Sequence, residues 1–132
     1  MQILLDTHIL LWFLEDSPRL KKHCKAIIED ESNEIFIGTV SFFEIAIKVS
    51  LGKLALPSSM ESLVLKTIEK DIQIIDINHY HTLEYLNIPL IEDHKDPFDR
   101  LIIALAHHED LTVISADGNF KYYTSIIKLI EA

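Results

Sequence analysis

Residues 1–8 read Met1-Gln2-Ile3-Leu4-Leu5-Asp6-Thr7-His8, a short apolar run that stops at a carboxylate. A continuous apolar run of this length is typical of a strand in a sheet whose two faces are both covered. A helical pattern of apolar residues follows at once. Open α/β sheets bind ligands at the carboxyl ends of their strands, so Asp6 is the first candidate for a functional site.

Strand and helix patterns alternate along the rest of the chain. Apolar runs predict strands at residues 3–5, 34–38, 72–77, 112–115 and 126–130. Apolar spacing and capping residues predict helices at residues 7–15, 18–30, 39–52, 58–70, 78–86 and 96–109, the second of them opening on Pro18 after a Ser17 cap. This alternation predicts a single α/β domain over residues 1–132, built on a largely parallel sheet.

The composition is that of an ordinary globular protein, with 48% hydrophobic and 25% charged residues. No apolar run reaches the length of a membrane span, and the first residues lack the basic segment of a signal peptide. Cys24 is the only cysteine, which excludes an intrachain disulfide and a cysteine-based zinc site. We therefore expect a reducing, cytoplasmic setting.

A formal net charge of −9 argues against a protein that binds nucleic acid through a broad basic face. It is compatible with a protein that reaches phosphate groups through bound divalent cations, because clustered carboxylates hold such ions. It also favours a basic partner protein.

Five carboxylates fall where the predicted topology brings them to one edge of the sheet. Asp6 and Asp117 each follow a strand directly, and the others lie in the first turns of helices. The five are Asp6, Glu44, Asp96, Asp99 and Asp117. Like charges at such short range repel each other unless a cation compensates them. An oxygen-rich cluster suits Mg²⁺ or Mn²⁺, which activate water and neutralise phosphoryl groups.

Each carboxylate also has a purely structural interpretation. Asp6 and Asp96 are good helix caps, and Asp117-Gly118 is a common turn pair. The segment Ser41-Phe42-Phe43-Glu44 has the spacing of a capping box. The alternative to a metal site is therefore a set of coincident caps.

Three further residues are candidates for contact with a phosphate-containing substrate, namely Ser41, Lys48 and Arg100. Lys48 also forms an i,i+4 pair with Glu44, which supports a helix without any further role. Of the histidines, His8 and His94 lie nearest the predicted edge, where each either orients a carboxylate or phosphate or merely packs. We expect His79 and His81 at or near the surface.

Four stretches together resemble the PIN-domain ribonucleases, and most closely the VapC-type toxins of type II toxin–antitoxin pairs. They are Leu4-Leu5-Asp6-Thr7-His8, Ser41-Phe42-Phe43-Glu44-Ile45-Ala46-Ile47-Lys48, Asp96-Pro97-Phe98-Asp99-Arg100-Leu101-Ile102-Ile103-Ala104 and Val113-Ile114-Ser115-Ala116-Asp117. Their order and spacing span almost the whole chain.

The resemblance implies a three-layer α/β/α sandwich and a metal-dependent endoribonuclease. It implies that Asp6, Glu44 and Asp99 hold Mg²⁺ or Mn²⁺, with Asp117 as the more variable fourth acid. Asp96 is then either the helix cap or a residue behind the ligands that holds Asp99 or Arg100. The family also implies homodimers and a small antitoxin that covers the site. The high net negative charge requires RNA to be held locally, by the metal, Lys48, Arg100 and the basic segment 19–25.

Two other function classes fit parts of the sequence. A catalytically degenerate PIN-like binding module shares the fold, although such a module is expected to have lost one of the acids. Another Mg²⁺-dependent α/β phosphohydrolase also places an Asp after its first strand. However, response-regulator receivers carry paired acids there, and haloacid-dehalogenase-like phosphatases carry Asp-x-Asp, whereas residue 8 here is His.

Overall fold

The centre of the computed structural model, which describes residues 1–132, is a sheet of five parallel strands in the order β3-β2-β1-β4-β5. The strands are β1 (Gln2–Leu5), β2 (Glu34–Gly38), β3 (Gln73–Ile75), β4 (Thr112–Ser115) and β5 (Leu129–Glu131). Every neighbouring pair is parallel, so the prediction of a largely parallel sheet is confirmed.

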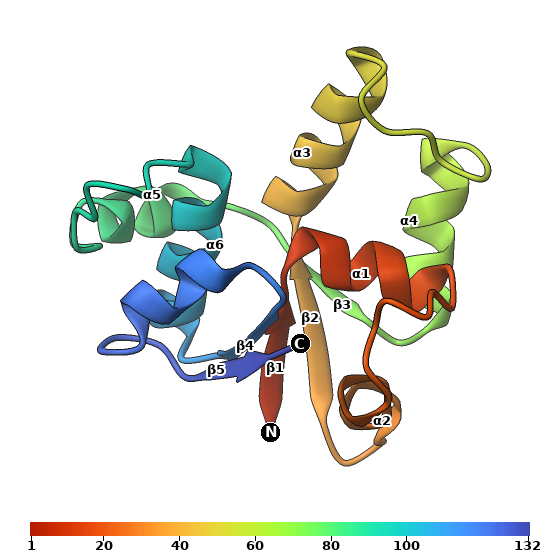
Figure 1. The fold of residues 1–132 in the computed structure, drawn as a ribbon, viewed down its shortest axis with the longest axis horizontal. Coiled ribbons are helices and arrows are strands. Elements are labelled where there is room, and N and C mark those ends of the chain that lie inside the picture. The colour runs from red at the N-terminus through yellow and green to blue at the C-terminus, as the bar shows by residue number, and fades with distance from the viewer.

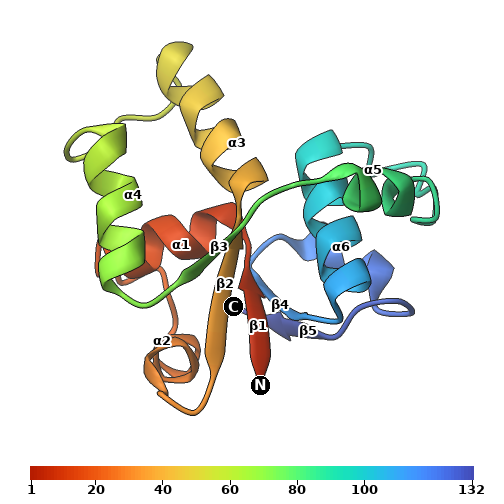
Figure 2. The ribbon, with the colours of Figure 1, turned by 180° about the vertical axis from the view of Figure 1, so that it is seen from behind.

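Helices cover both faces of this sheet (Figures 1 and 2). One layer holds α1 (Thr7–Leu14), α2 (Lys22–Glu29) and α4 (Met60–Glu69), and the other holds α5 (His79–Tyr85), α6 (Pro97–Glu109) and the short 3₁₀ helix η1 (Gly118–Tyr123). Successive side chains of a strand point to opposite faces of the sheet, so the apolar residues of β1 contribute to the cores beneath both helix layers. Ile3 and Leu5 pack in the core beneath α1 and α2, whereas Leu4 packs in the core beneath α6. The predicted α/β/α sandwich is confirmed.

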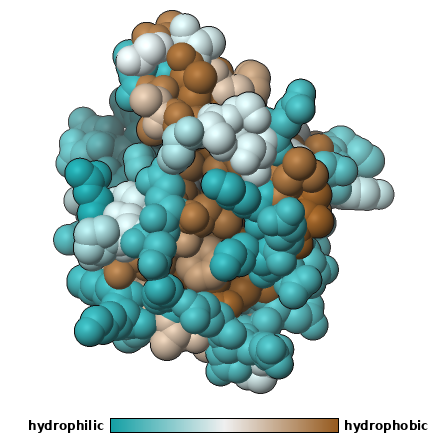
Figure 3. Space-filling view, turned by 90° about the vertical axis from the view of Figure 1, so that its right-hand side faces the viewer, coloured by the Kyte–Doolittle hydropathy of each residue, from teal (hydrophilic) through white to brown (hydrophobic).

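The helix α3 (Thr39–Ser50) stands out from the carboxyl end of β2 (Figure 1). Leu11, Ile45 and Leu63 form a small separate core that joins it to α1 and α4. Beyond this core the far end of α3 keeps apolar side chains in solvent, with Leu51 62% exposed. In Figure 3 these apolar residues gather at the top of the molecule, over the end of α3 and the loop to α4.

The strand order reverses on either side of β1, with β2 on one side and β4 on the other. In open parallel sheets a crevice forms at such a point, outside the carboxyl ends of the strands. Leu5 pairs with Ile114, so the next residues of the two strands, Asp6 and Ser115, lie side by side at this crevice. Gly38 ends β2 at the same edge, where a Cβ atom would come within 2.7 Å of the Leu105 side chain. Any larger residue at this position would therefore force the buried Leu105 side chain to shift.

Three predicted element boundaries are wrong. The second helix begins at Lys22 rather than Pro18, because Ser17 caps a turn in which Leu20 N–H donates to Ser17 O and Leu20 enters the core. The strand β3 is shorter than predicted, since it pairs only with β2 and that pairing ends at Ile75. The last strand begins at Leu129 because Ile126 and Ile127 form a turn on Tyr123 O.

None of the helices combines the length and the apolar composition that crossing a bilayer requires.

Candidate metal centre

Asp6 caps α1 at the crevice and is held by two donors. Its Oδ1 accepts a hydrogen bond from Thr7 N at 2.8 Å, and its Oδ2 accepts one from Ser115 Oγ at 2.7 Å. The side chain is almost fully buried, and burial raises the pKa of Asp6 above its ordinary value, with a small further rise from Glu44. The two hydrogen bonds act in the opposite direction, because they stabilise the carboxylate. Asp6 is thus both the predicted cap and a fixed member of the site.

Glu44 reaches the same crevice from α3. The Thr7 hydroxyl donates to Glu44 Oε1 at 2.8 Å, and Lys48 Nζ lies 3.0 Å from Glu44 Oε2. The cap of α3 is Gly38, which has no side-chain hydrogen bond, so the capping-box interpretation of Ser41 and Glu44 is wrong. Glu44 is buried at the crevice without any capping role to account for it.

Asp99 lies in the first turn of α6 and shows most directly that the carboxylates converge. Its pKa is raised to about 8, first by burial and then by repulsion from four neighbouring acids. In order of decreasing effect these are Asp6, Asp96, Asp117 and Glu44. A carboxyl group is shifted in this way only when it is buried and other acidic groups lie close to it. All five predicted carboxylates are therefore brought together.

Like Asp6, two more of the five, Asp96 and Asp117, also serve as caps. Asp96 Oδ1 accepts hydrogen bonds from Phe98 N and Asp99 N, and Asp117 Oδ1 accepts one from Asn119 N. Each nevertheless lines the same cleft of about 390 Å³ as Asp6, Glu44 and Asp99. The capping and clustering interpretations of the sequence are thus both correct for these two residues.

His94 supports Asp99 from the loop that precedes α6. His94 Nε2 lies 3.0 Å from Asp99 Oδ2, and its Nδ1 lies 2.6 Å from the Tyr123 hydroxyl. When Asp99 is ionised, as a metal ligand must be, its carboxylate only accepts hydrogen bonds, so Nε2 carries the proton and Nδ1 accepts from Tyr123. Of the alternatives considered for His94, the structure shows a buried residue that orients a carboxylate.

Two predicted substrate contacts are corrected by the structure. Arg100 is buried, and its guanidinium donates to Pro89 O and Ile88 O and lies over the ring of Tyr85, so it is not available to RNA. Ser41 is fully buried with its Oγ 2.8 Å from Thr7 Oγ1, so it holds Thr7 instead of facing a substrate. Lys48 remains at the cleft, partly exposed.

The donor set fits a hard divalent cation. Carboxylate oxygens from four separate elements face one cleft, and uncompensated repulsion among them is the condition that a cation removes. Carboxylate oxygens of Asp99 and Asp117 lie within 4.8 Å of each other. Mg²⁺ and Mn²⁺ prefer such oxygen-rich sites.

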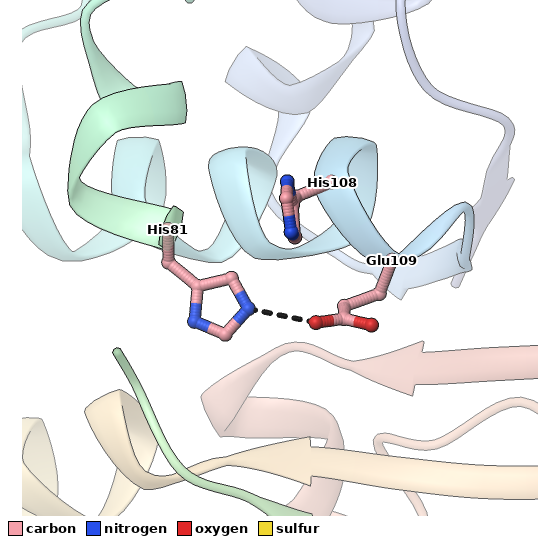
Figure 4. A group of neighbouring side chains, drawn as sticks. All are labelled: His81, His108 and Glu109. Carbon is pink, nitrogen blue, oxygen red and sulfur yellow. Dashed lines mark hydrogen bonds and ion pairs between the residues drawn. The ribbon is translucent and has the colours of Figure 1, made fainter. Parts of the chain in front are cut away.

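A second group with potential ligands lies between α5 and α6 (Figure 4) and is not built for a metal. His81 is fully buried, contrary to expectation, with Nδ1 accepting from Asn78 N and Nε2 2.9 Å from Glu109 Oε1. Because Nδ1 accepts the hydrogen bond from Asn78 N, it carries no proton, and the ring proton is on Nε2. The protonated Nε2, which faces Glu109 and His108, cannot bind a metal ion. Metal-ligating histidines instead donate their second N–H. His81 thus joins two helices.

Comparison with known proteins gives one family match. A family model described as PIN domain matches residues 3–125. No protein with a curated description matches the sequence.

Several solved structures share the fold over nearly the whole chain. A chain of VapBC2 from Rickettsia felis, bound to a DNA fragment from the promoter, is 21% identical, with a TM-score of 0.71 and coverage of 99% of this chain and 98% of that chain. A chain of VapBC-5 from Mycobacterium tuberculosis is 17% identical, with a TM-score of 0.65 and coverage of 99% and 98%. A chain of FitAcB from Neisseria gonorrhoeae is 19% identical, with a TM-score of 0.63 and coverage of 98% and 96%.

Proposed function

The chain belongs to the PIN-domain family, and from this premise we propose that it is a Mg²⁺- or Mn²⁺-dependent endoribonuclease, the toxin of a toxin–antitoxin pair. The observation that carries the proposal is the cleft in which Asp6, Glu44, Asp99 and Asp117 meet, with the pKa of Asp99 raised to about 8 by burial and by its acidic neighbours. Capping alone gives no reason for this degree of crowding.

In this proposal Asp6, Glu44, Asp99 and Asp117 hold the metal, which when bound supplies charge neutralisation and an activated water for phosphodiester hydrolysis. The chain prepares these ligands before the ion binds. Ser115 and Thr7 fix the two oxygens of Asp6, Thr7 fixes Glu44, and His94 fixes Asp99. Lys48, at the rim beside Glu44, is placed to meet a substrate phosphate.

A protein partner is the second part of the proposal. The solved structures with this fold include VapBC2, VapBC-5 and a toxin–antitoxin complex from Klebsiella pneumoniae. We infer a small antitoxin with a basic residue, because the cleft is acidic and the chain carries a net charge of −9. The exposed apolar end of α3 gives such a partner a surface to cover (Figure 3). A homodimer and a single domain over residues 1–132 complete the proposal.

A degenerate PIN-like binding module is the competing function. It predicts a missing acid or an unsupported one, whereas every proposed ligand here is present and three are fixed by buried or part-buried hydrogen bonds. The catalytic proposal is therefore preferred.

Cleavage of single-stranded RNA by purified protein with Mn²⁺ tests the proposal. We expect products with 5′-phosphate and 3′-hydroxyl ends, and loss of cleavage in Asp6→Asn while its circular dichroism spectrum stays unchanged. The matched control is Asp76→Asn, an exposed acid outside the cleft, which should cleave like wild type. Equal cleavage by Asp6→Asn and wild type, from preparations free of contaminating nuclease, contradicts the proposal.

A further inference from the structure

An aromatic and basic rim borders the acidic cleft on the side of α1. His8 and Trp12 of α1 and Arg19 from the turn before α2 line the cleft together with the carboxylates. His8 and Trp12 are four residues apart, so they share a face of the helix that begins at Asp6. Their ring centroids lie 6.0 Å apart at an interplanar angle of 43°. The rim therefore extends outward from the proposed metal centre.

The three side chains are available to a ligand. His8 is exposed, and Trp12 is half-buried, packing partly against the core beneath α1 and partly lining the cleft. The Arg19 guanidinium makes no hydrogen bond and no ion pair, whereas Lys48, the other cation that lines the cleft, is paired with Glu44. An unpaired guanidinium beside two aromatic rings is an arrangement that binds a phosphate and an unstacked base together.

We propose that His8, Trp12 and Arg19 form a binding subsite for one nucleotide of a single-stranded nucleic acid. The base stacks on the Trp12 and His8 rings, and its phosphate contacts Arg19. The inference rests on the proposed function, since it places this nucleotide beside the phosphodiester that the carboxylates address. It also explains how an acidic protein holds RNA, because stacking does not depend on net charge. The buried Arg100 cannot supply this contact, whereas the exposed Arg19 can.

Trp12 is the only tryptophan in the chain, so its fluorescence reports on the subsite alone. The test titrates wild-type protein, in Mn²⁺, with a hexauridylate that carries phosphorothioate linkages to slow hydrolysis. We expect saturable quenching by the single strand and none by the same strand in a duplex, whose bases are already stacked. Arg19→Ala should weaken binding and reduce the salt dependence by about 0.7 of a logarithmic unit per unit of log salt. Lys128→Ala, an exposed cation outside both the cleft and the basic segment 19–25, is the matched control and should bind like wild type.

Variants at the aromatic positions separate stacking from simple packing. With a fluorescently labelled strand, Trp12→Phe should retain binding and Trp12→Leu should weaken it on the order of tenfold. His8→Ala leaves the tryptophan in place and should weaken binding by a smaller factor.

The outcomes distinguish this subsite from the proposed function. If Trp12 emission stays unchanged while the protein cleaves RNA, the subsite is overturned and the nuclease proposal stands. The same conclusion holds if RNA leaves the emission unchanged and a basic protein partner changes it. Quenching without any metal-dependent cleavage supports the subsite and contradicts the nuclease. Absence of both binding and cleavage overturns both.

Discussion

When Asp99 is ionised, His94 Nε2 donates a hydrogen bond to Asp99 Oδ2 over 3.0 Å, and this bond ties the loop before α6 to the acidic cleft. Behind it, Tyr123 donates to His94 Nδ1 and lies 3.5 Å from the Arg100 guanidinium. The donors point in one direction, from Arg100 through Tyr123 and His94 toward Asp99. This series of hydrogen bonds orients the carboxylate of Asp99, the group whose pKa is raised by four neighbouring acids.

Replacing His94 should weaken metal binding more than it weakens the fold. His94→Ala frees Asp99 to rotate, and loss of a group that supports a ligand lowers metal affinity by about 10- to 100-fold. His94→Asn should recover part of this loss if its amide reaches Asp99. The Mn²⁺ dependence of the melting temperature measures the effect, with exposed His79→Ala as the control. Equal Mn²⁺ affinity in His94→Ala and wild type contradicts the positioning role.

The pKa of Asp99 predicts how the stability of the metal-free protein depends on pH. The pKa is about 8 in the folded protein, against an ordinary value of 3.8. Between these values the folded protein keeps a proton that the unfolded chain has lost, so a rise in pH favours unfolding. The contribution is fully present below about pH 4 and disappears as the pH rises through 8.

Urea denaturation in EDTA at pH 5, 6.5 and 8 checks this dependence. The free energy of unfolding should fall over the series for wild type, and fall less for Asp99→Asn, which carries no titrating group at this position. Asp76→Asn should follow wild type. A wild-type free energy that rises between pH 6.5 and 8 runs against the predicted sign.

Arg100 should contribute to stability and not to RNA binding. Arg100→Met leaves the carbonyl oxygens of Ile88 and Pro89 without their donor, which costs about 2–4 kcal/mol of unfolding free energy. Lys48→Met should instead leave stability within about 0.5 kcal/mol, because its pair with Glu44 is partly exposed, and should weaken binding of the phosphorothioate strand. A reversal of the two effects would show that Arg100 reaches the substrate.

The fold was predictable because its signals are local. Short apolar runs marked every strand, and alternation with helices indicated the parallel sheet and its layers. The errors fell where a tertiary contact decides the outcome. Ser17 and Pro18 fit a helix start, yet burial of Leu20 bends the chain into a turn instead. Likewise, β3 is short because only β2 is available to pair with it.

The acidic residues of the site were predictable, whereas the residues that hold them by hydrogen bonds were much less so. Strand ends meet at one edge in any parallel sheet, so the carboxylates were found by topology. The role of Thr7 stayed open and Ser115 was missed, because which hydroxyl reaches which carboxylate depends on register. The pairing of Leu5 with Ile114, once known, places Ser115 beside Asp6. Tyr123 gave no signal in sequence, since it contacts His94 from 29 residues away.

The most direct test of the central claim, that the clustered carboxylates hold a divalent cation, is a Mn²⁺ titration of thermal stability in wild type and Asp6→Asn. An ion that binds only the folded state raises the melting temperature, with about 2.7 kcal/mol of added stability at a concentration one hundred times the dissociation constant. We predict a saturable rise for wild type and none for Asp6→Asn. A wild-type protein that shows no rise, or an Asp6→Asn variant that shows the same rise, contradicts the account.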